Sequence, residues 1–242
     1  MFPTIGHLGP FTIHSYGLML AIAVLVCTFF IRWEAKKAGI SPDELTDLIF
    51  WTVFFGIIGA RIFFVLVHWE LFKDNLIEIL MVQNGGLSWQ GSLIAGGLTA
   101  WWIIRAKKLP VAVVLDLVAP YLALGQAIGR LGCFLNGCCY GKEVSWGIYC
   151  PLHEARLHPT QLYDAFGLLI IFLFLKSFQK RNTRAGAIFV WYLLLALSLR
   201  FVIEFFRADH ATLALGLSIY QFVCLMIIIV TIYAATRFYR PR

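Results

Sequence analysis

Residues 186–206 read GAIFVWYLLLALSLRFVIEFF, a run in which Arg200 and Glu204 are the only charged side chains. A helix of about 20 mostly apolar residues spans the hydrocarbon core of a bilayer. A charged side chain near the bilayer centre costs at least about 2.5 kcal/mol on insertion scales, so charges retained there indicate function. This stretch therefore predicts a membrane-spanning helix that carries part of a functional site.

The composition of the whole chain agrees with that interpretation. The 242 residues are 60% hydrophobic and 14% charged, and the mean hydropathy is +0.80. Soluble domains are about 45–50% apolar and about 25% charged, so the composition argues against both a soluble domain and a disordered chain. We expect one transmembrane domain over residues 1–242. The net charge is +7, and the basic residues fall in small, loop-sized groups. This pattern is typical of the cytoplasmic loops of a membrane protein and does not indicate nucleic-acid binding.

Seven apolar runs predict an all-α, polytopic membrane protein with about seven transmembrane helices. The runs lie at 15–32, 47–67, 91–105, 111–131, 161–178, 186–206 and 215–236. With the N-terminus outside, thirteen of the 20 Lys and Arg residues fall in inside loops, the last three being Arg237, Arg240 and Arg242. Four fall outside: Lys73, Lys142, Arg156 and Arg207. The positive-inside rule then predicts an outside N-terminus and a cytoplasmic C-terminus. Residues 1–13 lack the basic start of a signal peptide, so we expect the first span to be retained.

Two outside segments are longer than turns. Residues 68–90 mix charges with apolar residues, which predicts a short amphipathic helix at the membrane interface. Residues 133–160 are rich in Gly, Cys and Pro and could form a small lid or head. We expect these two segments to be the periplasmic arm and head of the domain.

Several arginines are predicted at the outer level of the helices. Arg130 lies in GQAIGRLG and Arg61 in GARIFF, while Arg200 and Glu204 share one helix face and Arg207 follows one turn later. Mutual neutralisation is one explanation of the Arg200 and Glu204 pair. It does not cover Arg130 and Arg61, which have no acidic neighbour within a turn of sequence. Converging arginines predict an anionic ligand, and a phosphate that arrives from a bilayer belongs to a lipid headgroup.

Polar residues in three further motifs are candidates for substrate binding. Asn136 and Gly141 lie in the glycine-rich stretch GQAIGRLGCFLNGCCYGK (125–142). His158 and Gln161 lie in HPTQLYD (158–164), where the alternative is a helix cap at His158 and an aromatic-belt anchor at Tyr163. Two more candidates stand at predicted span starts: Tyr16 in TIHSYGLM (12–19), an interfacial aromatic on the simpler view, and Gln90 in NGGLSWQG (84–91).

Four of the six cysteines are predicted to lie outside, where disulfides are permitted: Cys133, Cys138, Cys139 and Cys150. Sequence alone does not give their connectivity. Zinc is the alternative, but the spacing C-x4-C-C-x10-C lacks the usual C-x2-C pairs, so we expect no metal ion and no cofactor. Cys27 and Cys224 fall within spans and are expected to be packing residues.

Taken together and in order, several segments resemble the prolipoprotein diacylglyceryl transferase family. They are FPTIGHLGPFTIHSYGLML, GARIFFVL, GGLSWQGSLIAGG, GQAIGRLGCFLNGCCYG, HPTQLYDAF, LRFVIEFFR and LGLSIYQF. The resemblance implies seven spans in a bacterial inner membrane and an active site that faces the periplasm. It also implies transfer of the diacylglyceryl group of phosphatidylglycerol to the lipobox cysteine thiol of a preprolipoprotein, with release of glycerol 1-phosphate.

The resemblance assigns roles residue by residue. Arg130 matches the phosphatidylglycerol-binding arginine of the family, and Arg200 matches a second essential arginine. Four further residues match motif positions: Tyr16, Asn136, Gly141 and Glu204. The chain departs from the family pattern at Gln90, where a histidine proposed to assist catalysis often stands, and at Cys133 and Cys138, where Asn and Glu are frequent.

The resulting hypothesis places Arg130, Arg200, Glu204 and His158 in catalysis. The remaining candidates, together with Arg130, bind substrate: Tyr16, Gln90, Asn136, Gly141, Gln161, Arg61 and Arg207. Glu204 or His158 are candidate bases, although arginines that favour the thiolate would make a protein base unnecessary. The alternatives are a divergent paralogue for another phospholipid or acceptor, a lipid-binding assembly protein, and a transporter of an anionic solute. A transporter would be expected to show an internal repeat, and we find none.

Overall fold

A computed structural model of the protein describes residues 2–8, 11–81, 85–151, 153–181, 184–208, 212–214 and 216–238. Within these ranges the long helices are α1 (Ser15–Ala35), α2 (Pro42–Val67), α3 (Trp89–Ala106), α4 (Val111–Asn136), α5 (Thr160–Gln179), α6 (Ala187–Glu204) and α7 (Ile219–Phe238). The short 3-10 helices are η1 (Lys36–Ala38), η2 (Trp69–Leu71) and η3 (Leu76–Leu80). Arg240 and Arg242, which enter the charge bias above, lie outside the described residues.

Three antiparallel strand pairs complete the secondary structure of the described residues. They are β1 (Thr4–Leu8) with β2 (Phe11–His14), β3 (Glu143–Cys150) with β4 (Ala155–Leu157), and β5 (Thr212–Ala214) with β6 (Leu217–Ser218). Each pair is a small hairpin beside a helix end, and the long elements are all helical. The predicted all-α class is therefore confirmed.

Six of the helices in the described residues, all but α3, are long and apolar enough to cross a membrane. The chain is thus a multi-pass membrane protein. The predicted third run does form a helix, α3, with Arg105 in its last turn, but it is not among the six. A membrane crossing by α3 stays a prediction. Helix α2 begins earlier than the predicted 47 because Pro42 at the first position and Asp43 and Glu44 in the first turn favour a helix start there.

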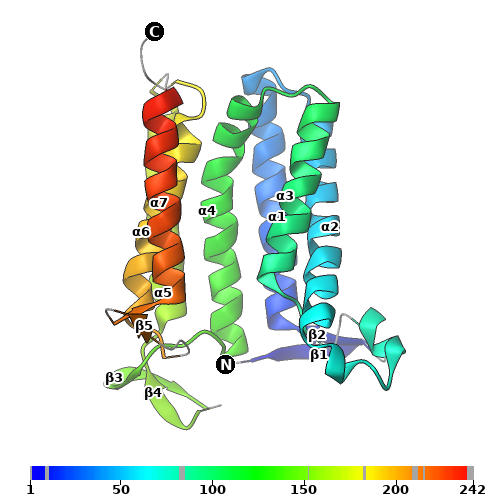
Figure 1. Ribbon diagram of the computed structural model, residues 1–242, viewed down its shortest axis with the longest axis vertical. Coiled ribbons are helices and arrows are strands. Elements are labelled where there is room, and N and C mark those ends of the chain that lie inside the picture. The colour runs from blue at the N-terminus through cyan, green and yellow to red at the C-terminus, as the bar shows by residue number, and fades with distance from the viewer. Residues whose placement is uncertain are drawn as a thin grey trace. The chain divides into compact units, whose positions relative to one another are not determined.

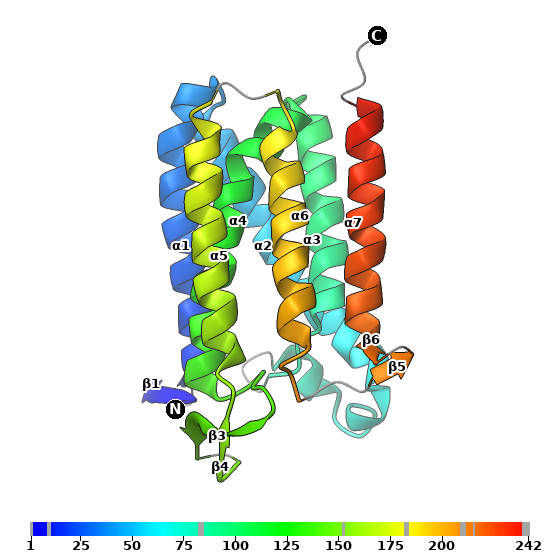
Figure 2. The ribbon, with the colours of Figure 1, turned by 90° about the vertical axis from the view of Figure 1, so that its left-hand side faces the viewer.

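The chain forms two compact units. The first unit comprises residues 1–27 and 115–242, and the second unit comprises residues 28–114. The first unit contains α5, α6, α7 and most of α4, and the second contains α2 and α3. In the first unit α6 lies beside both α5 and α7, which the ribbon shows from two sides (Figure 1 and Figure 2).

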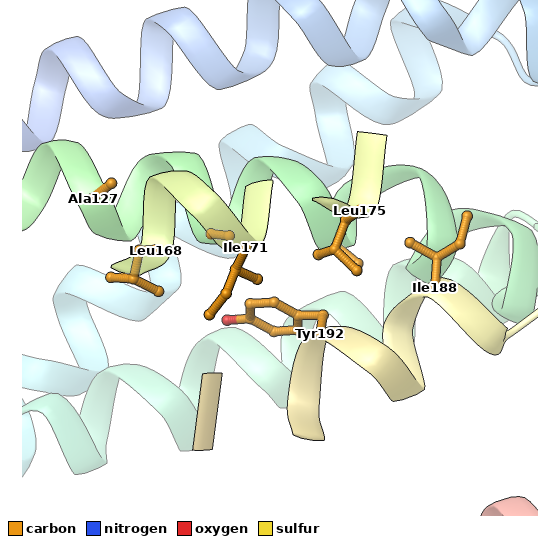
Figure 3. Close-up of a cluster of buried hydrophobic side chains, with 8 residues drawn as sticks. Ala127, Leu168, Ile171, Leu175, Ile188 and Tyr192 are labelled. Carbon is orange, nitrogen blue, oxygen red and sulfur yellow. The ribbon is translucent and has the colours of Figure 1, made fainter. Parts of the chain in front are cut away.

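The core of the first unit lies between α4, α5 and α6. Ala119, Ala123 and Ala127 recur every four residues on α4 and form its buried face in this core. Figure 3 shows Leu168, Ile171 and Leu175 of α5 facing Ile188 and Tyr192 of α6. The hydroxyl of Tyr192 accepts a hydrogen bond of 2.8 Å from Gln126 Nε2, so its one polar atom is satisfied within the core.

Asp116 joins α4 to the start of α6. Its carboxylate oxygens accept hydrogen bonds from the backbone N–H groups of Gly186, at 2.6 Å, and Phe189, at 2.9 Å. The first N–H groups of a helix have no partner inside the helix, so a carboxylate there supplies a cap and a favourable charge. An acidic residue inside an apolar run thus has a structural role.

Helices α2 and α3 of the second unit pack through glycines. A Cβ atom on Gly59 would lie against Ala95 and 2.7 Å from the carbonyl oxygen of Gly91. A Cβ atom on Gly96 would lie 3.2 Å from the carbonyl oxygen of Thr52. The two backbones therefore touch, as in other membrane helix pairs with small residues at the interface.

The predicted amphipathic helix over residues 68–90 is wrong. Before α3 begins at Trp89, the described part of this segment holds only the short 3-10 helices η2 and η3 and irregular chain. Arg61 of α2 explains the difference. Its guanidinium donates hydrogen bonds to five carbonyl oxygens, those of Glu78, Ile79, Met81, Gly85 and Gly86. Carbonyls that turn toward one side chain cannot continue a regular helix.

The hairpins of the first unit gather at one end of its helices. Figure 2 shows the β1, β3–β4 and β5–β6 elements at the end opposite the one where α7 finishes. The predicted head region contains the β3–β4 hairpin, where Tyr149 pairs with Arg156 and Cys150 pairs with Ala155. This end of the first unit also carries the side chains of the candidate site.

Candidate active site

The buried stripes of α4, α5 and α6 continue into polar residues at the hairpin end of the first unit. On α5, Asp164 precedes the core residue Leu168 by one turn. On α6, Arg200 follows the core residue Tyr192 by two turns. Residues four or eight apart share a helix face, so packing of the apolar stripes also directs these polar residues inward.

Arg130 and Asp164 form an ion pair between α4 and α5. The distance from Arg130 Nε to Asp164 Oδ2 is 3.0 Å, and the two side chains are 25% and 5% exposed. In sequence Arg130 has no acidic neighbour within a turn, and the tertiary fold supplies one. The carboxylate holds the Nε side of the guanidinium and leaves its other nitrogens for further contacts.

Glu204 lies between two arginines at the end of α6. Its Oε2 atom is 2.6 Å from Arg200 Nη2 and 3.9 Å from Arg207 Nε. Its Oε1 atom accepts a hydrogen bond of 2.9 Å from the hydroxyl of Ser218, at the start of α7. Gln221 fixes that turn by accepting the Ser218 N–H at 2.8 Å. Glu204 is only 5% exposed, so it is a firmly held anchor for both arginines.

These five charged groups form one electrostatic cluster. The charge of Arg200 interacts with those of Arg130, Asp164, Glu204 and Arg207. Three guanidinium groups therefore share two carboxylates, which leaves one positive charge in a partly buried place. The Nη1 atom of Arg200 is buried and has no hydrogen-bond partner among the described residues. A buried donor beside surplus positive charge fits an anion that accepts hydrogen bonds.

Gly141 lies where three segments cross. Its N–H donates to the carbonyl of His158 at 2.9 Å, it bridges to Arg207, and the next N–H, of Lys142, donates to the carbonyl of Phe206 at 2.8 Å. A Cβ atom on Gly141 would lie 2.5 Å from the carbonyl oxygen of Phe206. Only glycine fits, and this crossing places Arg207 beside the loop that follows α4.

His158 lies among aromatic rings. Its Nδ1 atom is 3.2 Å from the Tyr163 hydroxyl, and its ring meets those of Trp146 and Phe206 edge-on at 4.8 and 5.5 Å between centroids. Within the described residues it forms no ion pair with Glu204. The structure thus brings the predicted residue to this end of the unit, but in an aromatic setting apart from the carboxylates.

Three thiols lie against the charged cluster. The Sγ atoms of Cys133, Cys138 and Cys139 are all within 4.8 Å of one another. Hydrogen bonds from the Cys133 and Cys138 thiols lower the pKa of Cys139 below its ordinary value, and the charges of Arg207 and Arg130 act in the same direction. Cys133, Cys138 and Cys139 are free thiols in the structure, which records no disulfide among these three candidates.

The neighbouring candidates surround these thiols. Tyr16 lies close enough to interact with Arg130 and all three cysteines, and Asn136 lies within hydrogen-bond reach of the Cys138 thiol. Gln161 donates a hydrogen bond of 2.7 Å from Nε2 to the carbonyl of Cys138 and is 1% exposed. Its Oε1 atom has no hydrogen-bond partner among the described residues. The candidates of the first unit therefore occupy one region.

Arg61 and Gln90 belong to the second unit. The guanidinium of Arg61 is occupied by the five carbonyls described above and lies 5.1 Å from the ring centroid of Phe72. This geometry favours a structural role over the predicted contact with a ligand anion. Gln90 is exposed at the start of α3, where its Oε1 accepts a hydrogen bond of 2.5 Å from Ser88.

Two features of the site escaped the sequence-based prediction. Asp164 lies in the second turn of α5. Its sequence position could have predicted an ion pair, because an acidic residue within a span needs a partner. The thiol cluster gave no comparable signal, because C-x4-C-C matches no common ligand spacing. Its three members meet only because the chain reverses at Gly137, whose φ is 76°.

Residues 3–237 match the sequence model described as prolipoprotein diacylglyceryl transferase. A protein of Staphylococcus haemolyticus named phosphatidylglycerol--prolipoprotein diacylglyceryl transferase is 33% identical over 240 residues, which cover 94% of this chain and 85% of that protein. A protein of the same name from Trichormus variabilis is 36% identical over 227 residues, 87% of this chain and 80% of its own length. A third, from Staphylococcus carnosus, is 33% identical over 95% of this chain and 88% of its own length.

Proposed function

Because the chain belongs to the prolipoprotein diacylglyceryl transferase family, we propose that it is the enzyme that moves the diacylglyceryl group of phosphatidylglycerol onto a prolipoprotein. The acceptor is the lipobox cysteine thiol of that protein, and glycerol 1-phosphate is the leaving group. The names of relatives that are 32–36% identical over most of the chain support this activity. No cofactor is required for the group transfer itself.

The observation that carries the proposal is the convergence of Arg130, Arg200 and Arg207 around only two carboxylates. A phosphodiester has one negative charge and two free oxygens, which match the single surplus positive charge of the cluster. The Nη1 atom of Arg200 supplies a buried donor for one of these oxygens. Asn136, Gly141, Gln161 and Tyr16 are proposed to complete the headgroup site.

The proposed reaction forms one bond and breaks one bond. The acceptor sulfur attacks the glycerol carbon that carries the phosphate, and a C–S thioether bond forms. The C–O bond to phosphate breaks, and its electron pair stays on the phosphate oxygen of departing glycerol 1-phosphate. The guanidinium groups of Arg130 and Arg200 would stabilise the charge that gathers on this phosphate. Placing the sulfur next to the carbon supplies a further part of the barrier reduction.

The thiol proton passes to water or to the departing phosphate before or during the attack. A free cysteine thiol has a pKa of about 8.5, and cationic neighbours lower it. We propose that the arginine cluster favours the acceptor thiolate enough that no protein base is needed. Glu204 is held by two arginines and Ser218, which suits it to position Arg200. His158 remains the alternative base, and an acidic limb in the pH–rate profile that disappears in His158→Ala would support it.

We place the protein in the bacterial inner membrane with its N-terminus and its site on the periplasmic side. The positive-inside bias supports this orientation. Among the described basic residues, Lys176 and Arg237 lie near the ends of α5 and α7 that are remote from the hairpins. The segments 68–90 and 133–160 would then be the periplasmic arm and head of one transmembrane domain.

The test is a reconstituted transfer assay. Purified protein in vesicles that contain phosphatidylglycerol is incubated with a lipobox peptide, and mass spectrometry follows the thioether product while glycerol 1-phosphate is quantified. We expect both products in equal amounts. Arg130→Gln and Arg200→Gln should each abolish them, while the matched control Arg237→Gln, at the other end of the unit, should retain them.

Other outcomes would identify a different protein class. Free diacylglycerol without thioether indicates a lipase-like activity on the same headgroup. Product with another phospholipid but none with phosphatidylglycerol indicates a divergent paralogue. Absence of both products, with the protein folded and the lipid bound, contradicts the transferase proposal. The remaining candidates are then a transporter of an anionic solute and a lipid-binding assembly protein.

A further inference from the structure

The chain carries a cluster of three thiols that the proposed transfer does not use. Cys133 lies in the last turn of α4, and Cys138 and Cys139 lie in the loop that follows. Their Sγ atoms all lie within 4.8 Å of one another, and Cys133 is 8% exposed. We propose that these three residues form a binding site for a thiophilic metal ion, with Zn²⁺ as the ion of choice.

The sulfur geometry is close to that of a bound ion. Zinc–sulfur bonds are about 2.3 Å long, so two sulfurs on one tetrahedral ion lie about 3.8 Å apart. Sulfurs within 4.8 Å of one another reach this spacing by rotation of the cysteine side chains. Three protein ligands leave the fourth tetrahedral position for water or another small donor.

The backbone already has the conformation that such a site needs. Gly137 and Cys139 have positive φ values of 76° and 63°, and the N–H of Cys138 donates to the carbonyl of Cys133 at 3.2 Å. The chain therefore folds back over the end of α4 and returns two thiols to the first. A non-glycine residue with positive φ is uncommon, so contacts around Cys139 must hold this conformation.

Buried residues of α5 hold the loop without using the thiols. Thr160 Oγ1 donates to the carbonyl of Cys139 at 2.8 Å, and Gln161 Nε2 donates to the carbonyl of Cys138 at 2.7 Å. Both residues are 1% exposed. Outer contacts of this kind orient metal ligands and contribute to metal affinity. The cluster is thus supported on two sides, by α4 and by α5.

The three sulfur ligands and the charges around them determine which class of metal ion can bind. Three sulfur donors exclude Mg²⁺ and Ca²⁺, which prefer oxygen, and favour Zn²⁺ and its analogue Cd²⁺. Three thiolates and one divalent ion leave a net charge of −1, and Arg207 and Arg130 lie close enough to Cys139 to interact with it. Cys138 and Cys139 are partly exposed, which gives the ion a way in.

The experiment uses the full chain, purified in detergent with reductant, treated with chelator and then freed of both. Cd²⁺ is titrated while the thiolate-to-metal absorption is recorded, and Zn²⁺ is measured by competition with a coloured chelator. We expect one ion per chain. Cys133→Ser, Cys138→Ser and Cys139→Ser should each weaken binding by at least about 100-fold, and Thr160→Val by about tenfold. The matched control Cys224→Ser, in α7, should bind as the unaltered protein does.

A folding readout separates loss of the site from loss of the fold. Zn²⁺ should raise the unfolding temperature of the unaltered chain and of Cys224→Ser but not that of Cys139→Ser. The proposal is overturned by three free thiols that bind no Cd²⁺, by equal affinity in Cys139→Ser, or by a disulfide between these cysteines in protein isolated without reductant. None of these results depends on transferase activity, so this inference and the proposed function fail separately.

Discussion

Arg130 of α4 and Asp164 of α5 meet at 3.0 Å although neither has an opposite charge within a turn on its own helix. Apolar packing below the pair, from Ala127 and Leu168, brings the two helices together at this level. The pair is therefore a consequence of helix packing, and it holds one of the three arginines in place.

Removing one partner of this pair should destabilise the protein. Asp164 is only 5% exposed, and breaking a buried ion pair on one side costs about 3–5 kcal/mol. We expect Asp164→Leu to lose about that free energy of unfolding, measured by denaturant titration in detergent micelles. The double variant Arg130→Met with Asp164→Leu should recover most of the loss and remain inactive. Equal stability of the single and double variants would contradict this account.

Arg200 should be needed for the shape of its guanidinium as well as for its charge. Arg200→Lys keeps a positive charge near Glu204 but removes the forked donors, including the buried Nη1 atom. We expect kcat/KM for phosphatidylglycerol to fall by about 100-fold, the cost of one donor to a developing oxyanion. The unfolding free energy should change by less than about 1 kcal/mol. Arg237→Lys, exposed on α7, is the control, and full activity of Arg200→Lys would refute the requirement for the fork.

Gly141→Ala should destabilise the crossing that places Arg207. The added methyl group would lie 2.5 Å from the carbonyl oxygen of Phe206 and 2.6 Å from Cβ of His158. Crowding of this kind costs about 1–3 kcal/mol. Gly129→Ala is the matched control, because its Cβ has no atom within 4 Å among the described residues and alanine favours a helix. The unfolding temperature should fall in Gly141→Ala and rise in Gly129→Ala, relative to the unaltered protein. A Gly141→Ala protein as stable as the unaltered protein would exclude the close approach.

Arg61→Lys should loosen the segment after α2 even though the charge remains. One ammonium group cannot replace a guanidinium that donates to five carbonyls. We expect faster amide hydrogen exchange over η3 (Leu76–Leu80), and a loss of about 3 kcal/mol in unfolding free energy, since hydrogen bonds to charged groups contribute about 1.5–3 kcal/mol each. Unchanged exchange in η3 would instead favour a ligand-binding role for Arg61.

Asp116→Ala should destabilise the start of α6. The variant loses the acceptor for the N–H groups of Gly186 and Phe189, and the loss of a helix cap costs about 1–2 kcal/mol. Asp116→Asn keeps one acceptor oxygen, so its free energy of unfolding should fall by less than that of Asp116→Ala. Denaturant titration gives the order of stability, and an alanine variant as stable as the unaltered protein would show that the cap contributes nothing.

Local sequence predicted the parts of the site that share a helix. The i,i+4 spacing of Arg200 and Glu204 on α6 is enough to place them on one face, and the structure confirms their contact at 2.6 Å. Partners on different elements were not predictable. Asp164 and Ser218 meet their arginine and carboxylate partners through helix packing, and Arg61 finds carbonyls 17–25 residues away in the chain.

The amino-acid sequence by itself determined the membrane-spanning helices and the family, because hydrophobic length and motif order are properties of contiguous residues. The tertiary structure alone decided that Arg130 pairs with Asp164, that Arg61 binds backbone carbonyls, and that Cys133, Cys138 and Cys139 form one cluster. The physical reason is that these contacts join residues whose distance depends on how helices pack and where loops reverse. No local pattern of residues encodes that distance.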